Sequence, residues 1–250
     1  MTRIKEYDVL KVIAIILVVL SHSTYYNIFS NYGGIAYQQY INNHLSLTVY
    51  KIFSKLVEVI YYFHMPLFMA ISGVFFSIQV KNNRWYEIES LLTNKFRRLM
   101  IPFFVFTLLY TVPIKYLSNY FDGVSLWNAV VGQLFLLGNS HLWYLYALFC
   151  IFIAGFYFLK KDTSIFVFLC LYILHVLSFS INLTLVSAPL QFLFWFSLGF
   201  LFETKRNQYN HYLKNNKWLS YLLALLFIAC VALNFAFKGD HKVLSRAILD

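Results

Sequence analysis

Long runs of apolar residues recur along the chain and constrain its fold more than any other feature. They lie at Val9–Tyr26, Leu56–Ile78, Leu99–Leu117, Leu142–Leu159, Ile165–Phe179, Leu185–Phe202 and Trp218–Phe237. A helix of about 20 apolar residues spans the hydrocarbon core of a bilayer. Because 60% of the residues are hydrophobic and only 12% are charged, the chain can neither cover a soluble globule nor remain disordered. The sequence therefore predicts an all-α, polytopic transmembrane helix bundle with about seven spans.

We expect residues 1–250 to form a single membrane-embedded domain. The stretch Leu126–Leu137 is too short to span and is interpreted as an interfacial or re-entrant piece. The cysteines Cys150, Cys170 and Cys230 all lie inside apolar runs, so we expect neither a disulfide framework nor a metal site.

The distribution of basic residues predicts the orientation of the chain. Basic residues gather in segments such as Lys95–Arg98, Lys160–Lys161 and Lys205–Arg206, which face the cytosol if the N-terminus does. Cytoplasmic loops of membrane proteins carry an excess of Lys and Arg. The net charge of +10 is therefore attributed to membrane topology, with the N-terminus cytoplasmic, and no nucleic-acid partner is expected.

The first span carries polar residues at membrane depth. Its uninterrupted apolar stretch, Val9–Leu20, is too short to cross a bilayer, so the helix should continue through Ser21, His22, Ser23 and Thr24. Lys11 and His22 are separated by about three helical turns, which places them on one face about 16 Å apart along the axis.

Two interpretations of this polar face remain open. His22 suits a general base near neutral pH, Lys11 suits an anionic donor that enters from the cytosol, and Asp8 is spaced to pair with Lys11. Alternatively, His22 bonds across helices and Lys11 extends to the inner membrane interface.

Four motifs, in this order, cover roughly residues 3–150. They are Lys11 and His22 in the first span, Phe63-His64-Met65-Pro66-Leu67-Phe68 with Ile71-Ser72-Gly73 in the second, Lys95-Phe96-Arg97-Arg98-Leu99-Met100-Ile101-Pro102 before the third, and His141-Leu142-Trp143-Tyr144-Leu145 at the fourth. Together they resemble the acyltransferase-3 family of bacterial membrane O-acyltransferases, especially its fucose 4-O-acetylase-like branch. Because family members commonly have more spans, the resemblance also implies that C-terminal spans of full-length relatives are missing here.

The resemblance implies a multi-pass enzyme of the bacterial plasma membrane. It would transfer an acyl group, usually acetyl from acetyl-CoA, to a hydroxyl of a glycan or another cell-surface acceptor. His22 would be the catalytic base, and Lys11, Lys95 and Arg98 would hold the donor phosphates. Acetyl-CoA or another acyl-CoA is then a co-substrate, and no bound cofactor is expected. The basic pair is Lys95-x-x-Arg98 where the family often has two arginines, which weakens bidentate phosphate contact.

Other polar residues are candidates for supporting roles. Asp8 would fix the direction of Lys11 within the catalytic group, and Ser21 or Ser23 would orient the His22 ring or line its pocket. Candidate acceptor or pocket residues are His64, His141, Trp143 and Tyr144. For His64 a structural role is an equally good interpretation. Trp143 and Tyr144 could instead be aromatic residues of the membrane interface.

The remaining polar groups of the apolar runs are given structural roles. Pro66 is expected to interrupt the second span and free a carbonyl for His64 or Ser72. Ser72-Gly73 would allow close helix packing. His175 is expected to be a packed core group.

Three functions are weighed. The leading hypothesis is an integral-membrane O-acyltransferase that uses a cytosolic CoA thioester, with a cell-surface polysaccharide or its lipid-linked precursor as acceptor and the lipid bilayer as its medium. The alternatives are a component of polysaccharide export or transport, and an inactive truncated relative.

Overall fold

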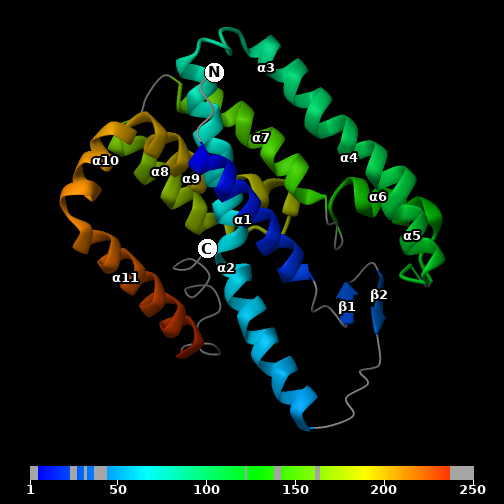
Figure 1. Cartoon of the computed structure of the whole chain (residues 1–250). Helices are drawn as coiled ribbons and strands as arrows, with labels where there is room; N and C mark the ends of the chain where they lie inside the picture. The colour runs from blue at the N-terminus through cyan, green and yellow to red at the C-terminus, as the bar shows by residue number, and fades with distance from the viewer. Residues whose placement is uncertain are drawn as a thin grey trace.

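The computed structural model describes residues 5–22, 27–30, 33–36, 44–121, 123–137, 142–160 and 164–236, and these are almost entirely helical (Figure 1). The helices are α1 (Lys5–His22), α2 (His44–Lys81), α3 (Ile88–Lys95), α4 (Ile101–Phe106), α5 (Val112–Leu117), α6 (Leu126–Leu134), α7 (Trp143–Phe158), α8 (Ile165–Ser178), α9 (Thr184–Thr204), α10 (Arg206–Asn215) and α11 (Lys217–Ala236). Two short strands, β1 (Asn27–Ser30) and β2 (Gly33–Ala36), pair antiparallel as a hairpin after α1. The predicted all-α class is confirmed, with this hairpin as a small addition.

Helices coincide with all seven apolar runs, but they differ in length. Three described helices are long and apolar enough to cross a membrane, namely Thr48–Lys81, Ile88–Leu117 and Thr184–Thr204. The count rises to four if Arg206–Asn215 and Trp218–Leu233, which meet at 99°, form one broken span. The chain is thus a multi-pass helical membrane protein, while the count of seven spans and the cytoplasmic N-terminus stay predictions. The stretch Leu126–Leu137 contains the short helix α6, as expected for a piece that does not span.

The centre of the bundle is the contact between α2 and α9. A Cβ atom on Gly73 would lie 1.9 Å from the carbonyl oxygen of Phe196, and one on Gly199 would lie 1.9 Å from that of Ala70. Only glycine allows two helix backbones to approach so closely. The predicted packing role of Gly73 is confirmed, and Gly199 supplies its counterpart on α9.

Aromatic side chains fill the core beside this contact. Phe76 of α2 packs against Phe152 of α7 and against Phe196 and Phe200 of α9, with ring centroids between 5.6 and 5.9 Å from its own. This cluster joins α2, α7 and α9 into one rigid unit. His175 of α8 is also buried, with Nδ1 2.6 Å from the Gln191 carbonyl oxygen, which confirms its expected place in the core.

Pro66 does not have the effect predicted from the sequence. It does not interrupt α2, which continues as one helix, and the carbonyls that His64 and Ser72 contact are those of Ile60 and Phe68. Pro66 is buried on the same helix face as Ala70 and Gly73, where close packing against α9 supports a continuous helix. In the third span, π-helical turns at Phe96–Met100 and Thr107–Thr111 each come just before a proline. A wider turn accommodates the carbonyl that a proline ring would otherwise strike.

Candidate active site

His22 lies at the end of α1 against the middle of α2. Its Nδ1 is 3.3 Å from the hydroxyl of Tyr61, and the two rings meet edge to face at a centroid distance of 6.0 Å. Tyr61 in turn packs against the ring of His64, at 5.0 Å. His64 is almost fully buried, and its Nδ1 lies 2.9 Å from the Ile60 carbonyl oxygen. The two histidines of the first and second motifs are therefore linked through one tyrosine.

Lys11 lies on the same α2-facing side of α1, nearer its start. Its ammonium nitrogen is 3.7 Å from the centre of the Phe75 ring and 4.0 Å from the Asp8 carboxylate. Because Phe75 and Tyr61 both belong to α2, Lys11 and His22 share a face of α1, as the spacing predicts. The Asp8–Lys11 pair is an i,i+3 contact on a half-exposed surface, where such pairs contribute about 1 kcal/mol or less.

Ser21 of the first motif does not join this cluster. Ser21 is fully buried and donates its hydroxyl to the Val18 carbonyl, 2.8 Å away, so it caps its own helix turn rather than orienting the imidazole. Ser23 lies outside the described residues, and so does His141 of the fourth motif.

The second and fourth motifs meet at Ser72 and Tyr144. The two hydroxyl oxygens lie 3.4 Å apart, and the Tyr144 ring packs edge to face on Phe68. Trp143 is half-buried and stacks on Phe192 of α9 at 5.2 Å, and Trp85 is buried in the same core. These aromatic residues are part of the core because α7 packs against α9 along this side.

The side chains of Lys95 and Arg98 lie in different environments, although both residues are at the π-helical turn Phe96–Met100 or next to it. The Lys95 ammonium lies 3.4 Å from the centre of the Phe152 ring and 5.5 Å from that of Trp85, whereas Arg98 is exposed. Neither residue lines a described pocket together with Lys11. Arg97, which lies between them, lines a polar pocket of about 510 Å³ with Arg84, Ser90 and Asn94.

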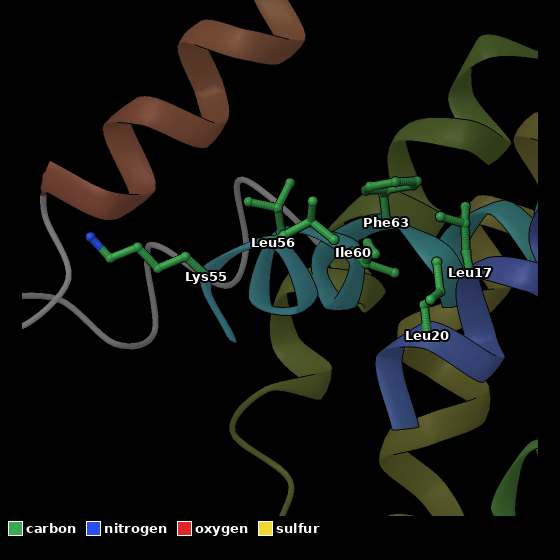
Figure 2. Close-up of a pocket in the computed structure, with 7 residues that line it drawn as sticks. Leu17, Leu20, Lys55, Leu56, Ile60 and Phe63 are labelled. Atoms are coloured by element: carbon green, nitrogen blue, oxygen red, sulfur yellow. The ribbon is translucent and has the colours of Figure 1, made fainter. Parts of the chain in front are cut away.

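An apolar groove lies beside the His22–Tyr61–His64 cluster (Figure 2). It has a volume of about 820 Å³ and is lined by Leu17, Leu20, Lys55, Leu56, Val59, Ile60 and Phe63. Figure 2 shows the leucines of α1 next to Ile60 and Phe63 of α2, and Lys55 at the far end with its ammonium pointing away from α1. Leu20 and Ile60 are close neighbours in sequence of His22 and Tyr61, so the groove adjoins the cluster.

Sequence reasoning missed two tyrosines, one that contacts His22 and one near the start of α1. Tyr61 is one of 20 tyrosines, and no spacing rule connects it to His22. Tyr7, in the turn before the apolar run of α1, donates its hydroxyl to the carboxylate of Glu203, which is buried at the end of α9. Burial and this hydrogen bond raise the pKa of Tyr7 to about 12, so the phenol stays protonated at physiological pH. Among the residues that the structure describes, no group of three or more His, Cys, Asp or Glu could hold a metal ion.

A histidine with a tyrosine partner, and a cation on the same helix face, are groups suited to acyl transfer. A family model described as an acyltransferase domain, of the acyltransferase-3 type, matches residues 4–246. The chain therefore belongs to the acyltransferase-3 family, and it is a multi-pass membrane acyltransferase. No curated protein and no solved structure matches it.

Proposed function

We propose that this protein transfers an acetyl group from a cytosolic CoA thioester to a hydroxyl of a cell-surface polysaccharide or its lipid-linked precursor. It would act as an O-acetyltransferase of the bacterial plasma membrane. The observation that carries the proposal is the contact between His22 Nδ1 and the Tyr61 hydroxyl. The sequence predicts that His22 belongs to the first span, and ionisable groups in a span are costly and mark functional sites by default.

The contact suits His22 to the role of general base. When the imidazole donates its Nδ1 proton to the Tyr61 oxygen, it carries its lone pair on Nε2, the form that accepts a proton from a sugar hydroxyl. The sugar oxygen then attacks the thioester carbonyl and a C–O bond forms. The tetrahedral intermediate collapses as the C–S bond breaks, and the imidazolium returns its proton to the departing thiolate.

Reconstitution tests this function directly. The purified protein in proteoliposomes is given acetyl-CoA labelled in its acetyl group together with a glycan acceptor, and the label is followed by mass spectrometry of the glycan. Label on a glycan hydroxyl, dependent on the protein, is the expected result. Glycan transport without any acyl donor, and without labelling, would instead identify an export component.

Replacing Tyr61 with phenylalanine should lower kcat by about two- to tenfold, since one hydrogen bond of about 0.5–1.5 kcal/mol that positions His22 is lost. KM should not change, because Tyr61 positions the base and does not touch the donor phosphates. The readout is a double-mutant cycle with His22→Ala, in which Tyr61→Phe should have no further effect. An equal loss in both backgrounds would show that Tyr61 acts on folding rather than through His22.

The groove of Figure 2 supports the lipid-linked form of the acceptor. Its lining is apolar except for Lys55, so it suits a hydrocarbon tail whose phosphate pairs with the lysine at the end of the groove.

Filling the groove should therefore affect one kind of acceptor only. Leu56→Trp should raise KM for a polyprenyl-phosphate-linked glycan by about tenfold, as expected when contacts worth about 1.4 kcal/mol are lost. The KM for a water-soluble fragment of the same glycan should stay unchanged. Val49→Trp, an exposed site on α2 that does not line the groove, serves as the control. Equal KM changes for both acceptors would exclude the lipid-tail assignment.

A further inference from the structure

A second cavity lies at the opposite end of α1 from His22. It has a volume of about 380 Å³ and is formed between the first turns of α1, the second half of α2, the end of α9 and α10. Its lining residues are Glu6, Tyr7, Leu10, Leu67, Ala70, Ile71, Val74, Gly199, Phe202, Arg206, Tyr209, Asn210 and Leu213. Figure 1 shows α10 and the start of α1 at the same end of the bundle.

The lining of this cavity changes character along its length. The polar and aromatic groups come from the first turn of α1 and from α10, including Tyr7, Arg206, Tyr209 and Asn210. The wall contributed by α2 is apolar, from Val74 to Leu67. A mostly apolar pocket of several hundred Å³ with a few convergent polar groups is typical of a small-molecule site.

The polar end is held in place by contacts between four helices, α1, α2, α9 and α10. Arg206 lies with its guanidinium carbon 5.4 Å from the centre of the Tyr7 ring, and Tyr7 bonds to Glu203. Lys81 donates to the Glu203 backbone carbonyl, and the hydroxyls of Ser77 and Thr204 lie 3.1 Å apart. These contacts fix the ends of α1, α2 and α9 relative to one another, so the polar end is already formed without a ligand.

The α2 wall of the cavity continues along the same helix to the His22 cluster. Leu67, the lining residue of α2 nearest that cluster, is one helical turn from His64 and six residues from Tyr61, which is about 9 Å along α2 at 1.5 Å per residue. Lys11 borders the route, because Tyr7 and Lys11 contact the same Phe75 ring, with the Tyr7 ring centroid at 6.0 Å and the Lys11 nitrogen at 3.7 Å.

We propose that this cavity binds the nucleotide end of the acyl-CoA donor and directs its thioester arm along α2 towards His22. The assignment rests on the proposed function. Tyr209 offers a ring face for a purine, and the amide of Asn210 matches the donor and acceptor pattern of an adenine edge. Arg206 supplies a planar cation for a phosphate, with Lys11 beyond it. The apolar wall of α2 suits the slender, uncharged arm.

Binding of coenzyme A to the full chain in lipid nanodiscs tests this assignment. Arg206→Ala should weaken binding by about tenfold to a hundredfold, as expected for the loss of charge-assisted hydrogen bonds. Leu213→Trp, which fills the cavity without changing charge, should weaken it to a similar degree. Lys214→Ala, the same charge change on α10 outside the cavity, should leave affinity unchanged. Pantetheine, which lacks the nucleotide, should bind all four proteins equally and weakly.

The outcomes separate this proposal from the proposed function. Thermal unfolding of each variant without ligand identifies any variant that fails to fold. The two cavity variants are independent tests, because Arg206→Ala removes a charge and Leu213→Trp reduces the volume of the cavity. If wild-type protein binds coenzyme A and Leu213→Trp binds it equally well, the nucleotide lies elsewhere and the cavity assignment is overturned. If wild-type protein shows no affinity for coenzyme A, the acyl-CoA donor itself is excluded and the proposed function fails with it.

Discussion

Replacing His22 with alanine should reduce acetylation of the acceptor glycan by a factor of about 10² to 10⁴, the usual contribution of a positioned general base. The loss should appear in kcat, because the imidazole acts on the hydroxyl proton in the transition state rather than on the bound donor. Affinity for coenzyme A should remain, since the donor cavity lies at the other end of α1. The measurement is acetyl transfer per mole of purified protein, together with glycan mass spectrometry in cells at matched protein abundance.

His211→Ala is the matched control for this substitution. His211 is exposed on α10, contacts Asn215 and Tyr212, and lines neither the groove nor the cavity described above. Its replacement should leave acetylation unchanged. Unaltered acetylation in the His22→Ala protein would remove His22 from the mechanism, and with it the observation on which the proposed function rests.

The second large effect concerns folding rather than chemistry. Gly199→Ala should destabilise the bundle by about 1–3 kcal/mol or more, because its methyl group would meet the Ala70 backbone and cannot be accommodated without separating α2 from α9. The expected observation is a lower yield of monodisperse protein in detergent and a lower temperature of unfolding. Acetyl transfer should fall in proportion to the folded fraction.

Gly155→Ala offers a close comparison within the same core. A Cβ atom there would lie 2.9 Å from the edge of the Phe196 ring, a side chain that can shift, and not from backbone. Its cost should be clearly smaller than that of Gly199→Ala. Equal effects of the two substitutions would contradict the view that backbone contact between α2 and α9 sets the geometry of the bundle.

Much of the architecture follows from sequence pattern alone. The apolar runs are too long and contain too few charges for a soluble protein, so they predict membrane helices. The spacing of Lys11 and His22 predicts that they share a helix face. The helix α1 continues past Leu20 through Ser21 and His22, and the rest of the predicted continuation, Ser23 and Thr24, lies outside the described residues. Gly73 was identifiable as a packing position because small residues allow membrane helices to approach.

Periodicity indicates which face of a helix is buried but not which helix covers it. The partner of His22 is Tyr61, 39 residues further along the chain, and in a sequence with 20 tyrosines only tertiary packing selects it. Burial of Trp85 beneath Lys95 likewise depends on how α3 and α7 meet.

The sequence by itself determined a membrane-embedded helical chain, the family to which it belongs, and a cation and a histidine aligned on its first helix. Tertiary structure alone decided what those groups face: α2 beneath both of them, a groove beside His22, and a cavity where α1, α9 and α10 converge. The reason is physical. Local residue spacing fixes direction around one helix axis, whereas sites are formed between helices whose contact depends on the close approach of backbones at Gly73 and Gly199.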